Sequence, residues 1–183
     1  MAPPSTGTQL VSTAGKHRVG ATIRYVLDAN VFIAACRKYY AFDLVPAFWQ
    51  ALTAENQAGR ITSIDRVRLE LERGKDTLAT WAADHQGMFA STDDDAVIRS
   101  YRDIMTWLQA QGQFQDAAKA AFAGGADGWL IAFAKAHGHV VVTHEQPSAE
   151  SKRRVLIPNV CNAVGVTFSD PFAMLRQLGL TFA

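Results

Sequence analysis

Long apolar runs are missing from this sequence of 183 residues. The longest, residues 129–134 and 140–142, fall far short of the roughly 20 residues that cross a lipid bilayer, so no transmembrane helix is predicted. Residues 1–20 are rich in Pro, Ser, Thr and Gly, but they lack the basic start and apolar stretch of a secretory signal. We expect a flexible leader over residues 1–20 and one domain over residues 21–183.

Cysteine is scarce as well. Cys36 and Cys161 are the only two, and neither has the closely spaced Cys or His partners of a zinc site. The pattern therefore argues against a disulfide framework and a zinc centre, and it fits a reducing cytoplasm. Both side chains are expected to be small buried hydrophobic groups.

An excess of charge of one sign is also lacking, because 18 Lys and Arg face 17 Asp and Glu, for a net charge of +1. Hydrophobic residues make up 49% and charged residues 19% of the chain, which is typical of a folded globular domain. If four carboxylates bound metal, the rest of the surface would carry about +5, a charge that tolerates a phosphate backbone.

Short apolar segments alternate with stretches that have helical spacing. Strands are predicted at residues 24–27, 60–64 and 139–143, with short additions at 155–157 and 166–168. Helices are predicted at residues 44–58, 65–73, 76–85, 94–111, 115–122 and 126–137, and a last one begins at Asp170-Pro171. Asp43 is the expected cap of the helix over residues 44–58, and Gly59 its stop. Because parallel strands need crossover connections, this order predicts an α/β fold with a mainly parallel sheet.

Four acidic residues stand where such a fold places its ligand sites. Asp28 ends the first strand, Glu70 lies in a helix, Asp127 starts a helix after two glycines, and Glu145 follows the strand over residues 139–143. Clustered carboxylates repel one another and need a cation to stay charged. Mg²⁺ or Mn²⁺ prefers oxygen ligands and can activate water for attack on a phosphodiester.

Each acid also has a simpler interpretation. Asp28 would cap a helix, Glu70 would be a solvated helical residue, Asp127 a charge at a helix start, and Glu145 a loop charge. Asn30 would either cap a helix or orient a carboxylate or a metal-bound water. Spacing alone does not decide between these interpretations.

Four segments resemble the acidic motifs of PIN-domain nucleases. Tyr25-Val-Leu-Asp-Ala-Asn-Val-Phe-Ile33 is similar to the first, an apolar run followed by Asp-x-Asn. The second, third and fourth motifs resemble Val67–Leu71, Ala126–Ala132 and Val140–Glu145. In the fourth, Glu145 stands where the family usually has Asp, and its longer side chain puts direct metal binding in doubt.

The resemblance runs from about Arg24 to the C-terminus. It implies a three-layer α/β/α domain that hydrolyses RNA, often as the toxin of a type II toxin–antitoxin pair. A small antitoxin protein and a homodimer are the protein partners that it implies. It also implies that Asp28, Glu70, Asp127 and Glu145 form the metal site.

Other residues near these motifs have two interpretations each. Thr143 would hydrogen-bond an acid or a metal-bound water, or simply end a strand. His144 would contact phosphate, although a structural role is favoured. The basic run Lys152-Arg153-Arg154 would bind an RNA backbone or form a solvated loop.

Aromatic residues offer a further way to bind RNA, by stacking on unpaired bases. Tyr39 and Tyr40 have no spacing that assigns them to the core, so this role stays open for both. The tryptophans lie at helical apolar spacing and are expected to be core residues, namely Trp49, Trp81, Trp107 and Trp129.

The sequence therefore predicts a metal-dependent endoribonuclease. The alternative is a PIN-like RNA-binding or scaffold module without catalysis, which the replacement at Glu145 motivates. A phosphoryl acceptor role for Asp28 ranks far lower, because haloacid dehalogenase-like phosphatases need a second Asp where this chain has Asn30, and receiver domains need an acidic pair that is absent near the first strand.

Overall fold

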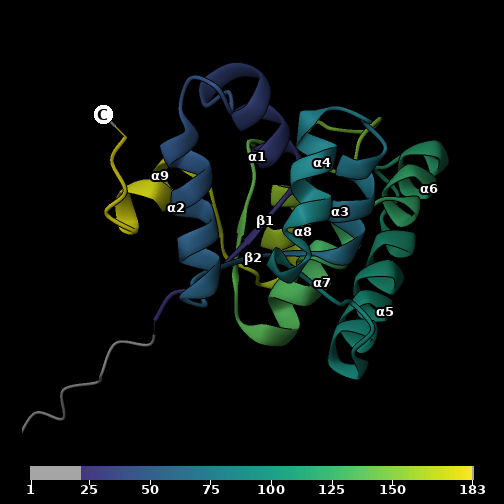
Figure 1. The fold of residues 1–183 in the computed structure, drawn as a ribbon. Coiled ribbons are helices and arrows are strands. Elements are labelled where there is room, and N and C mark those ends of the chain that lie inside the picture. Colours follow the sequence, from purple (N-terminus) through teal and green to yellow (C-terminus); the bar gives the residue numbers. More distant parts are fainter. Residues whose placement is uncertain (1–21, 183) are drawn as a thin grey trace, which may run out of the picture.

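A computed structural model describes residues 22–182 of the chain, so the leader expected over residues 1–20 lies outside the described residues. Five strands form one sheet in the order β3-β2-β1-β4-β5, and every neighbouring pair is parallel (Figure 1). The strands are β1 (Tyr25–Leu27), β2 (Ile61–Ile64), β3 (Phe89–Ala90), β4 (Val140–Val142) and β5 (Phe168–Ser169). The predicted parallel sheet is confirmed.

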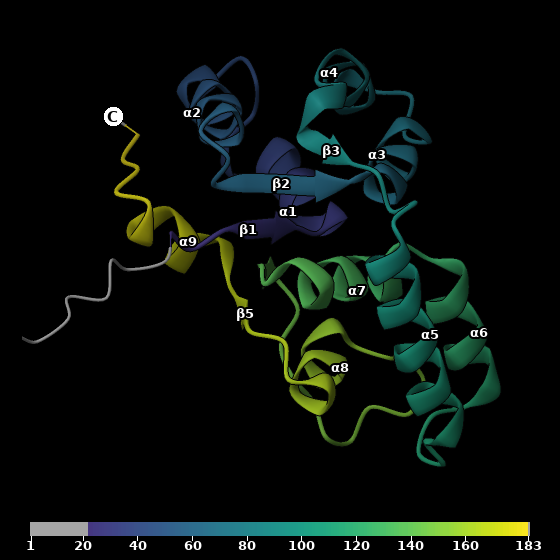
Figure 2. The same cartoon turned by 90° about the horizontal axis from the view of Figure 1, so that it is seen from below.

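Helices cover both faces of this sheet, as the view in Figure 2 shows. One layer contains α1 (Ala29–Ala34), the π-helix η1 (Ala35–Tyr39), α2 (Pro46–Gln57), α3 (Asp65–Glu72) and α4 (Thr77–Asp84). The opposite layer contains α5 (Asp95–Ala110), α6 (Asp116–Gly124), α7 (Asp127–His137) and α8 (Ile157–Val164). A short turn, η2 (Gln86–Met88), leads into β3, and α9 (Pro171–Gln177) returns toward α2. The three-layer α/β/α architecture is therefore confirmed.

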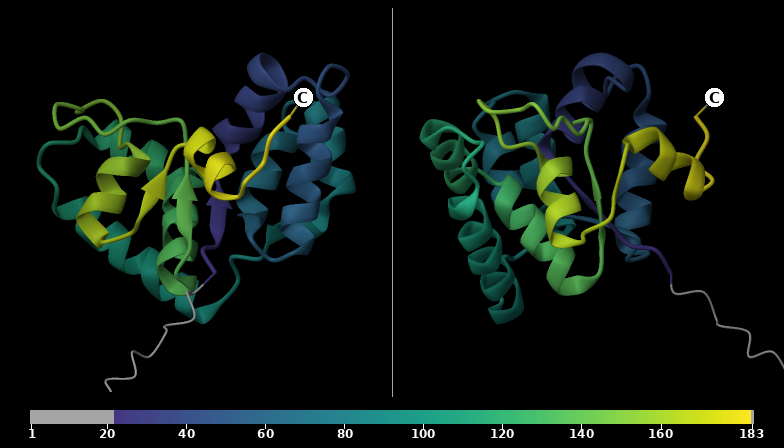
Figure 3. Two further views of the ribbon diagram at one scale, coloured as in Figure 1. Left: turned by 90° about the vertical axis from the view of Figure 1, so that its left-hand side faces the viewer. Right: turned by 180° about the vertical axis from the view of Figure 1, so that it is seen from behind.

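The order of the strands brings distant parts of the sequence together. From β1 the chain steps to β2 and β3 on one side, and β4 and β5 then form the other side (Figure 3). Tyr25 pairs with Val140 and Leu27 with Val142, so the carboxyl ends of β1 and β4 are adjacent. This is the point where the strand order reverses, which is where open α/β sheets bind their ligands.

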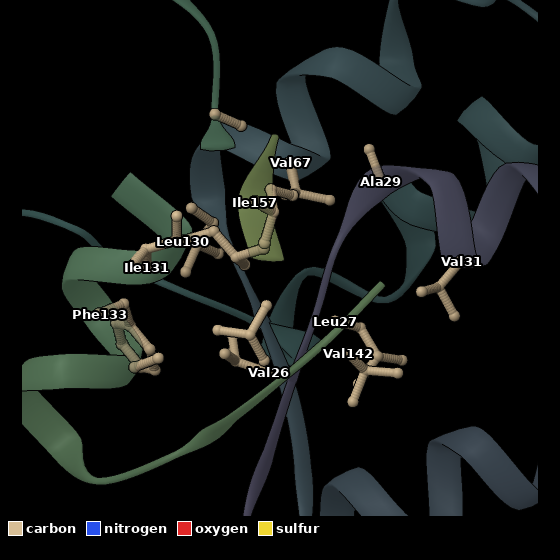
Figure 4. Packing of buried hydrophobic residues seen from close by; sticks show 14 of the residues in the cluster. Val26, Leu27, Ala29, Val31, Val67, Leu130, Ile131, Phe133, Val142 and Ile157 are labelled. Atoms are coloured by element: carbon tan, nitrogen blue, oxygen red, sulfur yellow. The ribbon is translucent and has the colours of Figure 1, made fainter. Parts of the chain in front are cut away.

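The first strand is apolar on both faces because both faces are covered. Val26 points toward Leu130 and Ile131 of α7, whereas Leu27 and Val142 lie together on the other face of the sheet (Figure 4). All five side chains are fully buried. A continuous apolar run is the expected composition of such a central parallel strand.

Two predicted strands differ from the structure. Residues 155–157 do not form a strand, because Ile157 is the first residue of α8 and Pro158 occupies the first turn of that helix. Proline favours this position, since its missing N–H has no partner to lose there. The strand predicted at 166–168 is instead β5, which begins at Phe168 and ends at Ser169.

The start of α2 also differs from the prediction. The helix begins at Pro46 and its cap is Val45, so Asp43 is not its cap. The fixed backbone angle of Pro46 sets the first turn in place of a side-chain cap. Gly59, with a φ of 71°, follows the helix as predicted, because this left-handed conformation favours glycine.

The expected core residues are buried to different degrees. Trp49, Trp81 and Cys161 are buried, as predicted. Cys36, Trp107 and Trp129 were also expected to be buried. They pack against the core but are only half-buried. None of the helices within residues 22–182 is long and apolar enough to cross a membrane.

Candidate active site

Asp28 lies at the junction of β1 and α1 and is only 4% exposed. Its Oδ2 accepts a hydrogen bond of 3.0 Å from the hydroxyl of Thr143, which follows β4. Although α1 begins at the next residue, the Asp28 side chain makes no capping hydrogen bond with the described residues of that helix. Asp28 therefore occupies the N-cap position of α1, but its carboxylate pairs with Thr143 and does not cap the helix.

The hydroxyl of Thr143 connects three segments of the site. It accepts hydrogen bonds from Asn30 Nδ2 at 3.2 Å and from the backbone N–H of Glu145 at 3.1 Å. A hydroxyl has one proton and two acceptor positions, so these two bonds direct its proton toward Asp28. Asn30 Oδ1 also accepts from the backbone N–H of His144 at 3.2 Å, which ties α1 to the end of β4.

Asp127 is the first residue of α7, and Glu70 fixes the start of that helix. Glu70 Oε1 accepts a hydrogen bond of 3.0 Å from the backbone N–H of Ala126, the residue that caps α7. This bond uses one of the N–H groups that have no partner at a helix start. Glu70 and Asp127 are thereby held next to each other.

Gly128 allows the start of α7 to pack closely against α5 and α6. A Cβ at this position would lie 2.9 Å from Met105 Cε and 3.1 Å from ring carbons of Phe122 and Tyr101. Any larger residue would have to displace these side chains or the helix itself. The position of Asp127, one residue earlier, therefore depends on this glycine, whose role no sequence motif indicates.

The carboxylates of the site perturb one another. Burial, followed by the negative charge of Asp127, raises the pKa of Asp28 to about 8, against the lowering effect of the Thr143 hydrogen bond. Burial, followed by Glu145 and Glu70, raises the pKa of Asp127 to about 6. Asp127 thus interacts with each of the other three predicted acids, and full ionisation of such a group requires a compensating cation.

Glu145 is held in place by two donors. Its Oε1 accepts a hydrogen bond of 2.7 Å from Arg154, and its Oε2 accepts one of 2.8 Å from the backbone N–H of Ile157. The second bond anchors the start of α8. Glu145 therefore connects the loop after β4 to this helix while its charge still acts on Asp28 and Asp127.

The basic residues of the following loop lie beside the acids. Arg153 and Arg154 line the same shallow pocket as Asp127, and Arg154 lowers the pKa of that carboxyl. Lys152 lines a neighbouring depression together with both arginines. The structure therefore places the three residues along one edge of the acidic group.

The oxygen donors of the site suit a divalent cation that keeps much of its water. Within residues 22–182, no group of three or more Asp, Glu, His or Cys side chains is arranged so that it could hold a metal ion. Mg²⁺, however, usually binds through one or two carboxylates and keeps several waters. Asp28 and Asp127 fit this mode, since Asp28 is buried, Asp127 is half-buried, and the charge of Asp127 raises the pKa of Asp28.

His144 belongs to an aromatic group beside the acids. Its ring lies 5.8 Å from that of Tyr39 and 6.1 Å from that of Phe172, measured between centroids. Burial lowers the pKa of His144, Asp170 opposes this effect and Lys38 adds to it. Phe172 could not be assigned to this site from the sequence, because only the return of α9 across the sheet brings it there.

The sequence matches a protein family, and the fold is similar to a solved structure. No curated protein matches the sequence. Among solved structures, the chain is similar to the crystal structure of FitAcB from Neisseria gonorrhoeae, with a TM-score of 0.49 and 18% sequence identity over 81% of this chain and 98% of that chain. Residues 25–182 match the sequence profile of a family described as Domain of unknown function (DUF4411).

Proposed function

The chain belongs to the DUF4411 family, and we propose that it is a Mg²⁺- or Mn²⁺-dependent endoribonuclease that hydrolyses RNA phosphodiester bonds. One observation carries the proposal. Asp28 is buried beside Asp127 and Glu145 where the strand order of a parallel sheet reverses. The resemblance of the four acidic segments to PIN-domain motifs supports the same activity.

Asp28 and Asp127 would hold the cation, with Glu70 and Glu145 adding negative charge from either side. A divalent ion bound there would lower the pKa of a coordinated water and stabilise the charge that develops on the phosphate. Two carboxylates leave enough coordination positions for water and for a phosphate oxygen. The four carboxylates would thus supply the negative charge that holds the cation and would position it next to the phosphate.

Thr143 and Asn30 would act as positioning residues. Thr143 fixes the orientation of the Asp28 carboxylate, and Asn30 fixes the hydroxyl of Thr143. Such partners of metal ligands commonly change metal affinity or activity by roughly 10- to 100-fold when they are removed. Neither side chain needs to touch the substrate for this role.

Lys152, Arg153 and Arg154 would neutralise phosphates on the substrate. Contacts of this kind supply affinity without sequence preference. Arg154 is 71% exposed on its side chain and still pairs with Glu145, so it can reach a phosphate beside the acids. The loop would thus align the RNA backbone with Asp127.

A second candidate function is RNA binding without catalysis, either as a binding or a scaffold module. It is favoured by the engagement of both Glu145 oxygens with Arg154 and the start of α8. In this alternative Glu145 only stabilises the loop before α8, and the four carboxylates do not hold a metal ion. RNA binding would then be unchanged by Asp28→Asn, and no divalent ion would stimulate cleavage.

The motif resemblance also supports a role as a toxin that acts on cytoplasmic RNA and is neutralised by a small antitoxin protein. Expression of the chain alone would then slow growth, and Asp28→Asn would abolish that effect. A neighbouring small reading frame that encodes a DNA-binding protein would supply the partner to test. Size measurements with and without that partner would show whether the chain forms a homodimer.

Cleavage of labelled total RNA with Mg²⁺ or Mn²⁺ tests the nuclease directly. Asp28→Asn and Asp127→Asn should each reduce cleavage by at least about 100-fold, as should EDTA, because each removes the bound ion. Asp116→Asn is a matched control, because Asp116 is an exposed carboxylate in the first turn of α6. Equal cleavage by wild type and Asp28→Asn, or the same cleavage in EDTA, would contradict the proposal.

A further inference from the structure

Three aromatic rings meet beside the acidic site from separate segments of the chain. Tyr39 ends η1, His144 follows Thr143, and Phe172 lies in α9. The Tyr39 and Phe172 rings meet edge to face, with centroids 5.4 Å apart and an interplanar angle of 82°. Together with His144 they form one surface, called here the aromatic surface.

Tyr39 is not part of the hydrophobic core. It is 46% exposed, whereas the next residue, Tyr40, stacks on Phe48 with ring centroids 4.2 Å apart and an interplanar angle of 13°. Packing therefore accounts for Tyr40 but leaves much of the Tyr39 ring open to solvent. The π-helix that ends at Tyr39 is a rare conformation that often occurs at functional sites.

The aromatic surface is continuous with the acidic site. The backbone N–H of His144 donates to Asn30, whose side chain also contacts Thr143 and through it Asp28. The basic loop of Arg153 and Arg154 lies at another edge of the acids, beside Asp127. A nucleic-acid strand that crosses the acidic site can therefore contact the arginines at one edge and the aromatic surface at another.

A cation also borders the aromatic surface. Lys38 is exposed and precedes Tyr39, and it forms no salt bridge with the described residues. Its neighbour Arg37 instead pairs with Asp76 at 3.3 Å. Tyr39 is exposed, whereas His144 and Phe172 are half-buried. An exposed ring next to a cation is the combination that binds single-stranded nucleic acid, in which bases stack and phosphates pair with Lys or Arg.

We propose that the aromatic surface of Tyr39, His144 and Phe172 stacks an unpaired base of an RNA strand whose backbone crosses the acidic site. The proposal rests on the proposed function and adds a base-binding site to it. Bases in an RNA duplex are already paired and stacked, and only splayed bases reach such rings. The aromatic surface is therefore a site for an unpaired base beside the acids.

Binding measured without divalent ions separates this inference from catalysis. A single-stranded RNA with 2-aminopurine, and the same RNA in a duplex, would be titrated in EDTA, because stacking quenches the fluorescence of this base. Tyr39→Leu keeps an apolar side chain but removes the ring, whereas Tyr39→Phe keeps the ring. Leu44→Ala, at another exposed apolar residue, is the control.

We expect Tyr39→Leu to weaken single-strand binding by about 5- to 100-fold and to abolish the quenching. Tyr39→Phe and Leu44→Ala should bind within about twofold of wild type. His144→Leu should resemble Tyr39→Leu, and circular dichroism would verify that each variant folds. Unchanged binding by Tyr39→Leu, or equal affinity for single-stranded and duplex RNA, would overturn the inference.

The two proposals can fail separately. Cleavage by wild type with no effect of Tyr39→Leu on binding would leave the nuclease standing and reject the aromatic surface. Ring-dependent binding without cleavage in Mg²⁺ or Mn²⁺ would reject the nuclease and keep the RNA surface. If RNA does not bind but an antitoxin does, and Tyr39→Leu weakens that complex, the aromatic surface is a protein interface and the inference is wrong.

Discussion

Thr143 donates a hydrogen bond of 3.0 Å to the buried carboxylate of Asp28, although the two residues are 115 positions apart in the sequence. The adjacency of β1 and β4 produces this contact, because Leu27 and Val142 pair directly before the two residues. Burial raises the pKa of this carboxyl to about 8, and the hydrogen bond from Thr143 opposes that rise. The contact therefore connects the topology of the sheet to the charge state of the proposed metal ligand.

Removal of the Thr143 hydroxyl should shift the pH dependence of activity. In Thr143→Val, Asp28 loses the hydrogen bond that lowers its pKa, so we expect its pKa to rise further above 8. Cleavage at pH 7 should fall by roughly tenfold, and the acidic limb of the pH–rate profile should move to higher pH. Thr143→Ser retains the hydroxyl and should keep the wild-type profile, whereas identical profiles for all three proteins would contradict the assigned contact.

The metal-free protein should be less stable at high pH. The pKa of Asp28 is raised from 3.8 to about 8 on folding, so between these values the folded state binds more protons than the unfolded state. Stability then falls as the pH rises from about 4 to about 8. We expect a Tm several degrees lower at pH 8 than at pH 5 in EDTA, and a weaker dependence in Asp28→Asn. Mn²⁺ should raise the Tm at pH 8 in wild type.

Gly128→Ala should destabilise the fold and displace Asp127. The new Cβ would lie 2.9 Å from Met105 Cε and press against two aromatic rings. Urea denaturation should show a loss of about 1–3 kcal/mol in the free energy of unfolding. Gly124→Ala is the control, because a Cβ there meets nothing within 4 Å. A Gly128→Ala protein with wild-type stability and activity would disprove the close packing at the start of α7.

Arg154→Ala should weaken RNA binding in a salt-dependent way. Loss of one phosphate contact should reduce the slope of log K against log salt by about 0.7 for a single strand. The pKa of Asp127 should also rise, because Arg154 lowers it in the intact protein. Arg102→Ala removes an exposed cation from α5 and should leave the slope unchanged. An unchanged slope in Arg154→Ala would place the RNA elsewhere.

The central strands and the positions of the acids within the fold were predictable because local patterns determine them. The apolar run before Asp28 and the one before Thr143 are long enough to identify buried strands, and parallel topology then brings their ends together. The contact of Asn30 with Thr143 was not predictable, since it depends on the register of β1 against β4.

The rest of the site depends on tertiary structure that short patterns do not encode. Strand β3 has two residues, Phe89 and Ala90, which are too few to show any period. The segment before Pro158 has the β-branched composition of a strand, but a helix starts at Ile157, whose N–H donates to Glu145 at the other end of the loop before α8. Phe172 reaches His144 only through the path of α9.

Anomalous scattering from crystals soaked in Mn²⁺ tests most directly whether Asp28 and Asp127 jointly hold a divalent cation. We predict one strong peak within bonding distance of both carboxylates in wild type, and none at this position in Asp28→Asn. A fully occupied Mn²⁺ site elsewhere, with Asp28 and Asp127 free of metal, would contradict it.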